Sequence, residues 1–270
     1  MPDIIRIDDA DDPRLEAYRA VRERDLMGRE NLFVIEGRVV LEKAVRAMPG
    51  AIASVLVAEH RADSLAEVLA GLPPGTPVYA AGQAAMDRVV GFPIHRGILA
   101  VGRRPSLTLD GLVASLPVRA LVVGLVGIAN HDNMGGIFRN AAAFGADAVL
   151  LDDTCCDPLY RKAIRVSVGA ALTVPFARAG DAGRLVGALA AAGFETVALT
   201  PQGQTELSAV AAGDRTAALF GAEGPGLPDE VLARARTVRI AMAGGFDSLN
   251  VATTSGIVLH RLAAGRGDRP

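Results

Sequence analysis

The sequence predicts an α/β protein whose second half forms an open, mostly parallel β-sheet. Apolar runs of strand length alternate with segments of helical spacing along the 270 residues. The run RALVVGLVGI (119–128) is almost continuously apolar, which is typical of a strand buried on both faces of a parallel sheet. Hydrophobic residues make up 50% of the chain, so a protein of this length can bury a large core.

The first hundred residues predict a compact α/β unit of their own. Prolines and polar residues at 103–117 then indicate a linker. We therefore assign residues 1–103 to a first domain, 104–117 to a linker and 118–270 to a second domain. The strands expected in the first domain are 31–37, 54–59, 78–82 and 97–104, and the helices are 14–27, 38–48 and 62–72.

The second domain repeats the alternation of strands and helices. Further strands are expected at 147–153, 171–177, 195–201, 217–223 and 238–242, and the helices between and after them at 135–145, 159–169, 183–193, 229–235 and 251–262. Open parallel sheets bind ligands at the carboxyl ends of their strands. The loops that follow these strands are therefore where a functional site is expected.

Composition excludes several classes of protein. A formal net charge of -2 argues against binding nucleic acid through bulk charge, although a local basic face remains possible. The arginines at 14–29 alternate with acids, so that segment is either a salt-bridged helix or an RNA-contacting surface. The two cysteines, Cys155 and Cys156, are adjacent and make a poor disulfide or metal-ligand set, so we expect no metal ion. Without a secretory signal or an apolar run of membrane-spanning length, we expect a cytoplasmic protein.

Three loops of the second domain bear polar residues next to glycines. In the first, Asp132 or Asn133 can cap a helix and Arg139 lies further along that helix. The second holds Gly221, Glu223 and Gly226, and its spacing differs from the dinucleotide pattern GxGxxG. The third places a flexible AGG before Ser248 and Asn250, and both of these residues are candidates to cap the helix that follows. Helix capping explains the polar residues of each loop taken alone. Three such loops, each at the end of a strand of one sheet, indicate a functional site more strongly than any one of them.

These loops resemble the three motifs of the SpoU, or TrmH-like, RNA 2′-O-ribose methyltransferases of the SPOUT class. The matching segments are NMGGIFRNAAAFG (133–145), LFGAEGPGL (219–227) and IAMAGGFDSLNVA (240–252), in the family's order. The first half is similar to the family's L30e-like substrate-binding domain through FVIEGRVVLEKAV (33–45) and HRGILAV (95–101). Two prolines of the family pattern are replaced here, one near His131-Asp132 and one at Ala241, and neither replacement removes a side chain expected to take part in the chemistry.

The resemblance implies a SPOUT α/β fold with a C-terminal trefoil knot, a topology that general rules of chain connection would not propose. It also implies that S-adenosylmethionine lies bent in the knot, held largely by backbone groups. The cofactor-binding residues expected from this analogy are Thr200, Gly221, Gly226, Ile240, Met242 and Leu249.

The catalytic residues that the resemblance implies are Asn133, Arg139, Glu223, Ser248 and Asn250. Arg139 acts either as a base or as an electrostatic and positioning group; a guanidinium gives up its proton with difficulty, which favours the second role. Glu223 orients Arg139 or shapes the cofactor pocket. The resemblance further implies a homodimer in which each site receives its arginine from the partner subunit.

The substrate expected from the resemblance is RNA, with ribosomal RNA favoured and transfer RNA as the nearest alternative. Tyr160, Arg161, Lys162 and Arg165 are read either as RNA-phosphate contacts or as a solvated basic helix. A non-catalytic RNA-binding or ribosome assembly factor with the same fold is the alternative from another class, and the presence of Arg139 and Asn250 counts against it. A nucleotide-binding oxidoreductase is disfavoured because the glycine fingerprint is absent.

Overall fold

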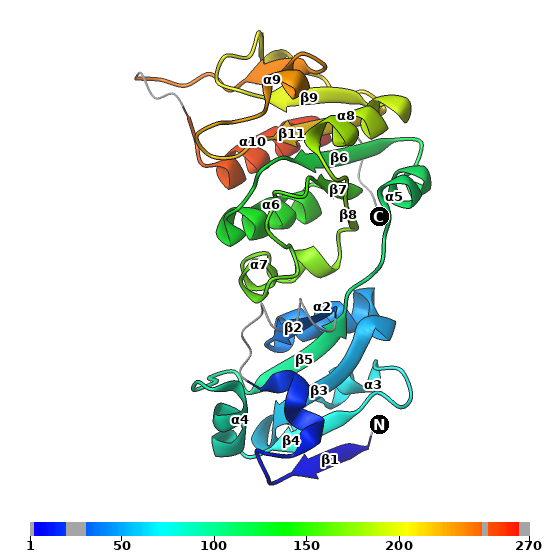
Figure 1. Ribbon diagram of the computed structural model, residues 1–270, viewed down its shortest axis with the longest axis vertical. Helices are drawn as coiled ribbons and strands as arrows, with labels where there is room; N and C mark the ends of the chain where they lie inside the picture. Colours follow the sequence, from blue (N-terminus) through cyan, green and yellow to red (C-terminus); the bar gives the residue numbers. More distant parts are fainter. Residues whose placement is uncertain (1–2, 20–30, 245–247, 265–270) are drawn as a thin grey trace. The chain divides into compact units, whose positions relative to one another are not determined.

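The computed structural model describes residues 3–19, 31–244 and 248–264, which form two compact units (Figure 1). Unit 1 contains the chain up to Ser106 together with Leu159–Thr173, and unit 2 contains Leu107–Pro158 and the chain from Val174 onward. Within the described ranges, no helix is long and apolar enough to cross a lipid bilayer.

Unit 1 is built on a mixed sheet with the strand order β1-β4-β3-β5-β2. The neighbours β1, β4 and β3 run parallel, whereas β5 pairs antiparallel with both β3 and β2. The strands are β1 (Ile4–Ile7), β2 (Leu32–Glu36), β3 (Ile52–Ala58), β4 (Val78–Ala81) and β5 (Ile98–Arg103). The helices are α2 (Arg38–Ala47), α3 (Ala66–Ala70), α4 (Gln83–Val90) and α7 (Arg161–Val166), with short 3₁₀ turns η1 (Pro13–Tyr18), η2 (Pro49–Ala51), η3 (Glu59–Arg61), η4 (Asp63–Leu65) and η5 (Ala170–Leu172).

The helix predicted at 14–27 is only partly within the described residues. Pro13–Tyr18 forms the 3₁₀ turn η1, and residues 20–30 lie outside the described ranges. Two of the predicted segment's arginines are paired with acids: Arg14 with Asp12 at 2.6 Å, and Arg19 with Asp11 at 3.1 Å. The described part of this segment is therefore a salt-bridged surface.

Unit 2 contains a parallel sheet with the strand order β10-β12-β9-β11-β6-β7-β8 among the described residues. Every pairing in it is parallel, which confirms the predicted sheet type. The strands are β6 (Ala120–Leu125), β7 (Ala148–Leu151), β8 (Phe176–Arg178), β9 (Glu195–Leu199), β10 (Thr205–Glu206), β11 (Arg215–Phe220) and β12 (Arg236–Arg239). The helices are α5 (Leu109–Ser115), α6 (His131–Ala143), α8 (Ala182–Ala191), α9 (Asp229–Leu232) and α10 (Val251–Ala263), with the 3₁₀ turn η6 (Leu207–Ala209).

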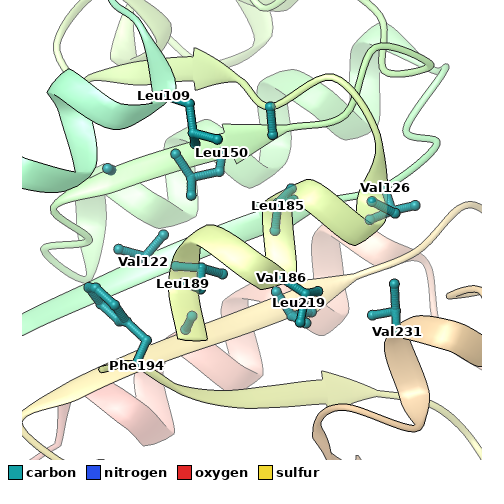
Figure 2. Close-up of a cluster of buried hydrophobic side chains, with 14 of the residues drawn as sticks. Leu109, Val122, Val126, Leu150, Leu185, Val186, Leu189, Phe194, Leu219 and Val231 are labelled. Atoms are coloured by element: carbon teal, nitrogen blue, oxygen red, sulfur yellow. The ribbon is translucent and has the colours of Figure 1, made fainter. Parts of the chain in front are cut away.

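Both faces of this sheet are covered by helices, which explains why its central strands are so apolar. On one face, Val122 and Leu219 pack against Leu185 and Leu189 of α8, together with residues of α5 and α9 (Figure 2). On the other face, α6 and α10 pack against each other and against β7 and β11 (Figure 1). The helices α6 and α10 thereby bring the first and third loops together.

Three details differ from the sequence-based boundaries. The predicted linker 104–117 contains α5, because Thr108 caps a helix whose Leu109 and Leu112 are buried in the unit 2 core. The predicted strand at 171–177 is shorter: Ala170–Leu172 forms a 3₁₀ turn, and only Phe176–Arg178 pairs as β8. Residues 159–173 were assigned to the second domain, but they pack within unit 1. The trefoil knot stays a prediction.

Candidate active site

A pocket of about 360 Å³ lies at the carboxyl ends of β9, β11 and β12, which are neighbours in the sheet. Because parallel strands end at the same edge of a sheet, the loops that follow them converge there. The pocket is lined by Leu199, Thr200, Pro201, Phe220, Gly221, Ala222, Glu223, Gly224, Gly226, Val238, Ile240, Met242, Ser248, Leu249, Asn250, Val251 and Thr254.

The six residues expected from the family analogy to bind a cofactor all line this pocket. They are Thr200, Gly221, Gly226, Ile240, Met242 and Leu249. Apolar side chains from Leu199, Phe220 and Val238 form much of the remaining wall. Among the described lining residues Glu223 is the one with a charged side chain, so the pocket suits a ligand held mainly by apolar and backbone contacts.

The glycine loop after β11 folds tightly onto itself. The Gly226 N–H donates to the Ala222 carbonyl at 3.0 Å, and these two residues form an isolated antiparallel bridge. A Cβ atom at Gly221 would overlap the backbone of Gly226. Gly221 is therefore needed for the close backbone approach that shapes this side of the pocket.

The polar residues of the three loops meet in one hydrogen-bonded cluster. The Asn250 side-chain nitrogen donates to Asn133 Oδ1 at 2.8 Å and to Glu223 Oε1 at 3.0 Å. The Asn133 side-chain nitrogen donates to the same Glu223 oxygen at 3.0 Å. Asn133 is buried, whereas Glu223 and Asn250 are exposed at the edge of the pocket. The cluster therefore joins one buried residue to two that a substrate can reach.

Two helices begin beside this cluster. The N-cap of α6 is Asn130, whose side chain accepts from the Asp132 N–H at 2.7 Å. The N-cap of α10 is Asn250, whose Oδ1 accepts from the Ala252 N–H at 3.0 Å and the Thr253 N–H at 3.2 Å. The amino ends of α6 and α10, which have positive partial charge, therefore both lie next to the cluster that contains Glu223.

Of the caps suggested by the sequence, Asn250 is confirmed for α10, whereas Asp132, Asn133 and Ser248 do not take the capping positions. Asn133 lies inside the first turn of α6, since the chain becomes helical at His131, and the extended Asn130 takes the capping position. Ser248 precedes the cap of α10, because Asn250 has the non-helical backbone angles φ -49° and ψ 136° that a capping residue needs. The Asn250 oxygen holds the helix while its nitrogen remains available to the cluster.

Comparisons with known proteins agree with this geometry. Residues 120–260 match the model of the SpoU rRNA Methylase family. The chain is 40% identical to an uncharacterized tRNA/rRNA methyltransferase of Mycobacterium bovis, over 96% of this chain and 91% of the relative. The chain belongs to the SpoU rRNA methylase family.

Solved structures show the same fold as this SpoU family member. The crystal structure of an AdoMet-bound rRNA methyltransferase from Sinorhizobium meliloti superimposes with a TM-score of 0.82, at 22% identity, over 96% of this chain and 97% of that chain. The crystal structure of an RNA 2′-O ribose methyltransferase superimposes with a TM-score of 0.79, at 26% identity, over 97% of this chain and 99% of that chain. The similarity therefore includes both units, not only the part matched by the SpoU model.

One of the five predicted catalytic residues does not join the pocket or the cluster. Arg139 is exposed on α6, two helical turns beyond the start of that helix, and it is not among the lining residues. Ser248, Glu223 and Asn250 line the pocket, and Asn133 contacts the last two. Within one chain of this SpoU protein, Arg139 is therefore separated from the other four residues.

The basic residues proposed from sequence as RNA contacts lie at α7, in unit 1. Arg161 forms an ion pair with Glu36 at 3.6 Å, and its guanidinium lies 5.0 Å from the centre of the Phe92 ring. Lys162 and Arg165 are exposed. Arg161 therefore contributes to the structure of unit 1, while Lys162 and Arg165 present charge to solvent.

Sequence reasoning missed several lining residues, notably Val251 and Thr254 in the first turn of α10. They are three residues apart on the predicted helix 251–262, so they share one face of it, and that spacing is the signal that could have found them. Among the described residues, no three histidine, cysteine, aspartate or glutamate side chains gather as metal ligands.

Proposed function

We propose that this protein is an S-adenosylmethionine-dependent RNA 2′-O-ribose methyltransferase that acts on ribosomal RNA. The observation that carries this proposal is the Asn133–Glu223–Asn250 cluster at the edge of the pocket. Membership of the SpoU rRNA methylase family supports the substrate class, and the 26% identical RNA 2′-O ribose methyltransferase supports the ribose as the site of methylation.

The pocket fits S-adenosylmethionine in size and chemistry. Its volume of about 360 Å³ is within the range of small-molecule sites, and its walls combine apolar side chains with strand-end backbone. Leu199, Phe220 and Val238 suit the flat face of an adenine, and the loops at Thr200, Gly221 and Ile240 would hold its polar edge. Gly226, Met242 and Leu249 complete the proposed cofactor site. When bound, S-adenosylmethionine supplies an electrophilic methyl group on a sulfonium.

The residues of the cluster orient the ribose. Asn133 and Asn250 are held by Glu223, so their positions are fixed before RNA binds. Ser248, exposed in the pocket wall, offers a hydroxyl to the sugar. Methylation forms a bond between the ribose 2′ oxygen and the methyl carbon, breaks the bond from that carbon to sulfur, and releases the hydroxyl proton to solvent. Holding the 2′ oxygen in line with the methyl group is the main contribution of these side chains.

Arg139 binds the phosphate next to the target ribose and stabilises negative charge on the 2′ oxygen. A guanidinium keeps its proton, so this electrostatic role suits it better than the role of a base. Because Arg139 lies apart from the pocket of its own chain, we propose a homodimer in which each pocket receives the partner's arginine. Leu249 and Ile257, each 41% exposed, are apolar residues of unit 2 that such an interface can cover.

Unit 1 is proposed to bind the RNA substrate, as expected for an L30e-like domain. A transfer RNA substrate is the second candidate, because the Mycobacterium bovis relative is described as a tRNA/rRNA methyltransferase. A non-catalytic RNA-binding factor is less well supported, since the polar cluster and the pocket are both intact.

Transfer of a labelled methyl group tests this function. The protein is incubated with labelled S-adenosylmethionine and, separately, with total ribosomal RNA and transfer RNA from cells lacking the gene. We expect labelling of ribosomal RNA, including immature ribosomal particles, and no labelling by an Asn133→Ala variant that still folds. Labelling of transfer RNA alone would show that transfer RNA, and not ribosomal RNA, is the substrate. Binding of RNA without any methyl transfer would favour a non-catalytic assembly factor.

A further inference from the structure

We propose that Asn140 is a positioning residue for the pocket, because its side-chain amide fixes the first turn of α10 against α6. This inference rests on the proposed function of the pocket as a cofactor site. Asn140 lies outside the catalytic and cofactor-binding residues considered above, and it does not line the pocket.

The Asn140 amide makes two contacts with α10. Its side-chain nitrogen donates to the main-chain carbonyl of Ala252 at 2.7 Å and to Ser255 Oγ at 2.9 Å. The Ser255 hydroxyl also donates to the Ala252 carbonyl at 2.7 Å, and Ser255 is fully buried. Both hydrogens of the Asn140 amide are thereby used in a largely enclosed contact, where a lost hydrogen bond is costly.

Close helix packing makes this contact possible. A Cβ atom at Gly136 of α6 would lie 2.7 Å from the Ala252 Cβ, and one at Gly256 of α10 would lie 3.2 Å from the Asn140 side-chain nitrogen. Glycines at these positions let the two helices approach closely enough for a short asparagine to reach a main-chain carbonyl. Such a contact favours one register of α10, because the amide bonds to the Ala252 carbonyl and to Ser255 Oγ at the same time.

The residues that Asn140 holds adjoin the pocket wall. Ala252 lies between Val251 and Thr254, both of which line the pocket, and it is two residues beyond Asn250, the cap of α10. The Thr254 N–H donates to the Asn250 carbonyl at 2.9 Å, so this turn and the cap move together. A shift of the first turn of α10 therefore displaces the pocket wall directly.

Besides packing and the Phe144–His260 ring contact, two side-chain hydrogen-bond links join α10 to α6 among the described residues. Asn133 contacts Asn250 at the helix ends, and Asn140 contacts Ala252 and Ser255 further along. Asn133 and Asn140 are seven residues apart, or about 10 Å along a helix. The two links act at different points along α10, so together they restrain its sliding and its rotation against α6 more than either link does alone. We infer that Asn140 keeps Asn250 aimed at Asn133 and Glu223.

The test replaces Asn140 by Asp, which keeps the shape and removes both donors, and by Ala as a second variant. The matched control is Val258→Ala, a fully buried residue of α10 away from the pocket, which destabilises the helix without touching the Asn140 contact. Binding of S-adenosylmethionine by calorimetry, thermal unfolding and amide hydrogen exchange without cofactor are measured for all four proteins.

We expect Asn140→Asp to raise the Kd for S-adenosylmethionine about tenfold or more, and the Asn140→Ala variant to do the same. Val258→Ala should change that Kd less than twofold, even where it lowers thermal stability as much as the Asn140 variants do. The KM for S-adenosylmethionine should rise in the Asn140 variants and stay near the unsubstituted value in Val258→Ala. Equal Kd changes in the Asn140 and Val258 variants would overturn the inference.

Hydrogen exchange separates this inference from the proposed function. In the cofactor-free Asn140 variants, the amides of Ala252 and Thr253 should exchange faster, while Val258→Ala should leave them protected. Failure of the unsubstituted protein to bind S-adenosylmethionine would refute the cofactor assignment, and the exchange data would still decide the role of Asn140. Unchanged exchange at both amides would contradict that role whatever the cofactor.

Discussion

The side-chain nitrogen of Asn250 lies 2.8 Å from Asn133 Oδ1, although the two residues are 117 positions apart in sequence. This contact joins the helix after β6 to the helix after β12, and Glu223 from the loop after β11 accepts from both asparagines. The same Asn250 side chain caps α10 through its oxygen. One side chain therefore has two functions that substitution can separate.

Asn250→Asp should separate capping from catalysis. The carboxylate still accepts from the Ala252 and Thr253 N–H groups, so thermal stability should stay near that of the unsubstituted protein. It cannot donate to Asn133 and it repels Glu223, so methyl transfer should fall about a hundredfold or more, the scale of losing one positioned polar group. Asn250→Ala loses the cap as well and should cost about 1 kcal/mol of stability. Parallel losses of activity and stability in the Asp variant would contradict this division.

Arg139 should affect methyl transfer and not cofactor binding. Because it lies outside the pocket, Arg139→Lys and Arg139→Ala should both bind S-adenosylmethionine with an unchanged Kd, measured by calorimetry. Lysine retains the charge and loses the planar fork that binds a phosphate in two places, so Arg139→Lys should lose most of the activity. Near-normal turnover in the Lys variant would exclude bidentate positioning.

Gly221→Ala should damage the pocket directly. The added methyl group overlaps the Gly226 backbone, so the loop after β11 must move. We expect at least a tenfold weaker Kd for S-adenosylmethionine, measured by calorimetry. Gly145→Ala is the matched control for replacing a glycine elsewhere in unit 2: it is strained by its φ of 66°, but an added Cβ meets no atom there. If only Gly145→Ala impaired binding, the pocket assignment would be wrong.

Both cysteine thiols should react slowly in the folded protein. Burial raises the pKa of Cys155 to about 12 and that of Cys156 to about 11, from an ordinary value of 9.0. At pH 8 neither is a thiolate, so iodoacetamide should label the unfolded chain much faster than the folded one. Folding raises both pKa values, so the contribution of the neutral thiols to the free energy of unfolding is fully present below about pH 9. This contribution should be lost as the pH rises from about 9 to 12. Fast labelling at pH 8 without unfolding would contradict this assignment.

Leu109→Ala tests the boundary between the units. The side chain of Leu109 is 3% exposed in the unit 2 core, and truncating a buried leucine costs about 2 to 5 kcal/mol. Chemical denaturation should show that loss in the free energy of unfolding. A loss below about 0.5 kcal/mol, typical of surface sites, would mean that residues 104–117 behave as the linker predicted from sequence.

Sequence patterns predicted the parallel sheet and the three loops because both depend on local properties. Apolar runs of strand length and residues such as Gly221 and Asn250 are visible in the chain itself. Patterns could not choose among neighbouring caps: Asn130, Asp132 and Asn133 are all suitable residue types, and the backbone angles that select Asn130 depend on packing.

Contacts between distant residues were beyond sequence reasoning. The Asn140 contact with Ala252 spans 112 positions and depends on glycines that let two helices meet. The helix α5 within the predicted linker 104–117 was not expected, because prolines and polar residues there concealed Leu109 and Leu112, which are three positions apart on one face of α5. The packing of 159–173 within unit 1 likewise has no local signature in the sequence.

The measurement that tests the central claim most directly is to identify the methylated atom in RNA labelled by the purified protein. Labelled RNA is digested with alkali, which cleaves every linkage except one next to a 2′-O-methylated ribose, and the products are separated and analysed by mass spectrometry. The account predicts label in an alkali-resistant dinucleotide that contains a 2′-O-methylnucleoside, and no label with Asn250→Asp. Label in a methylated base, released as a mononucleotide, would contradict it.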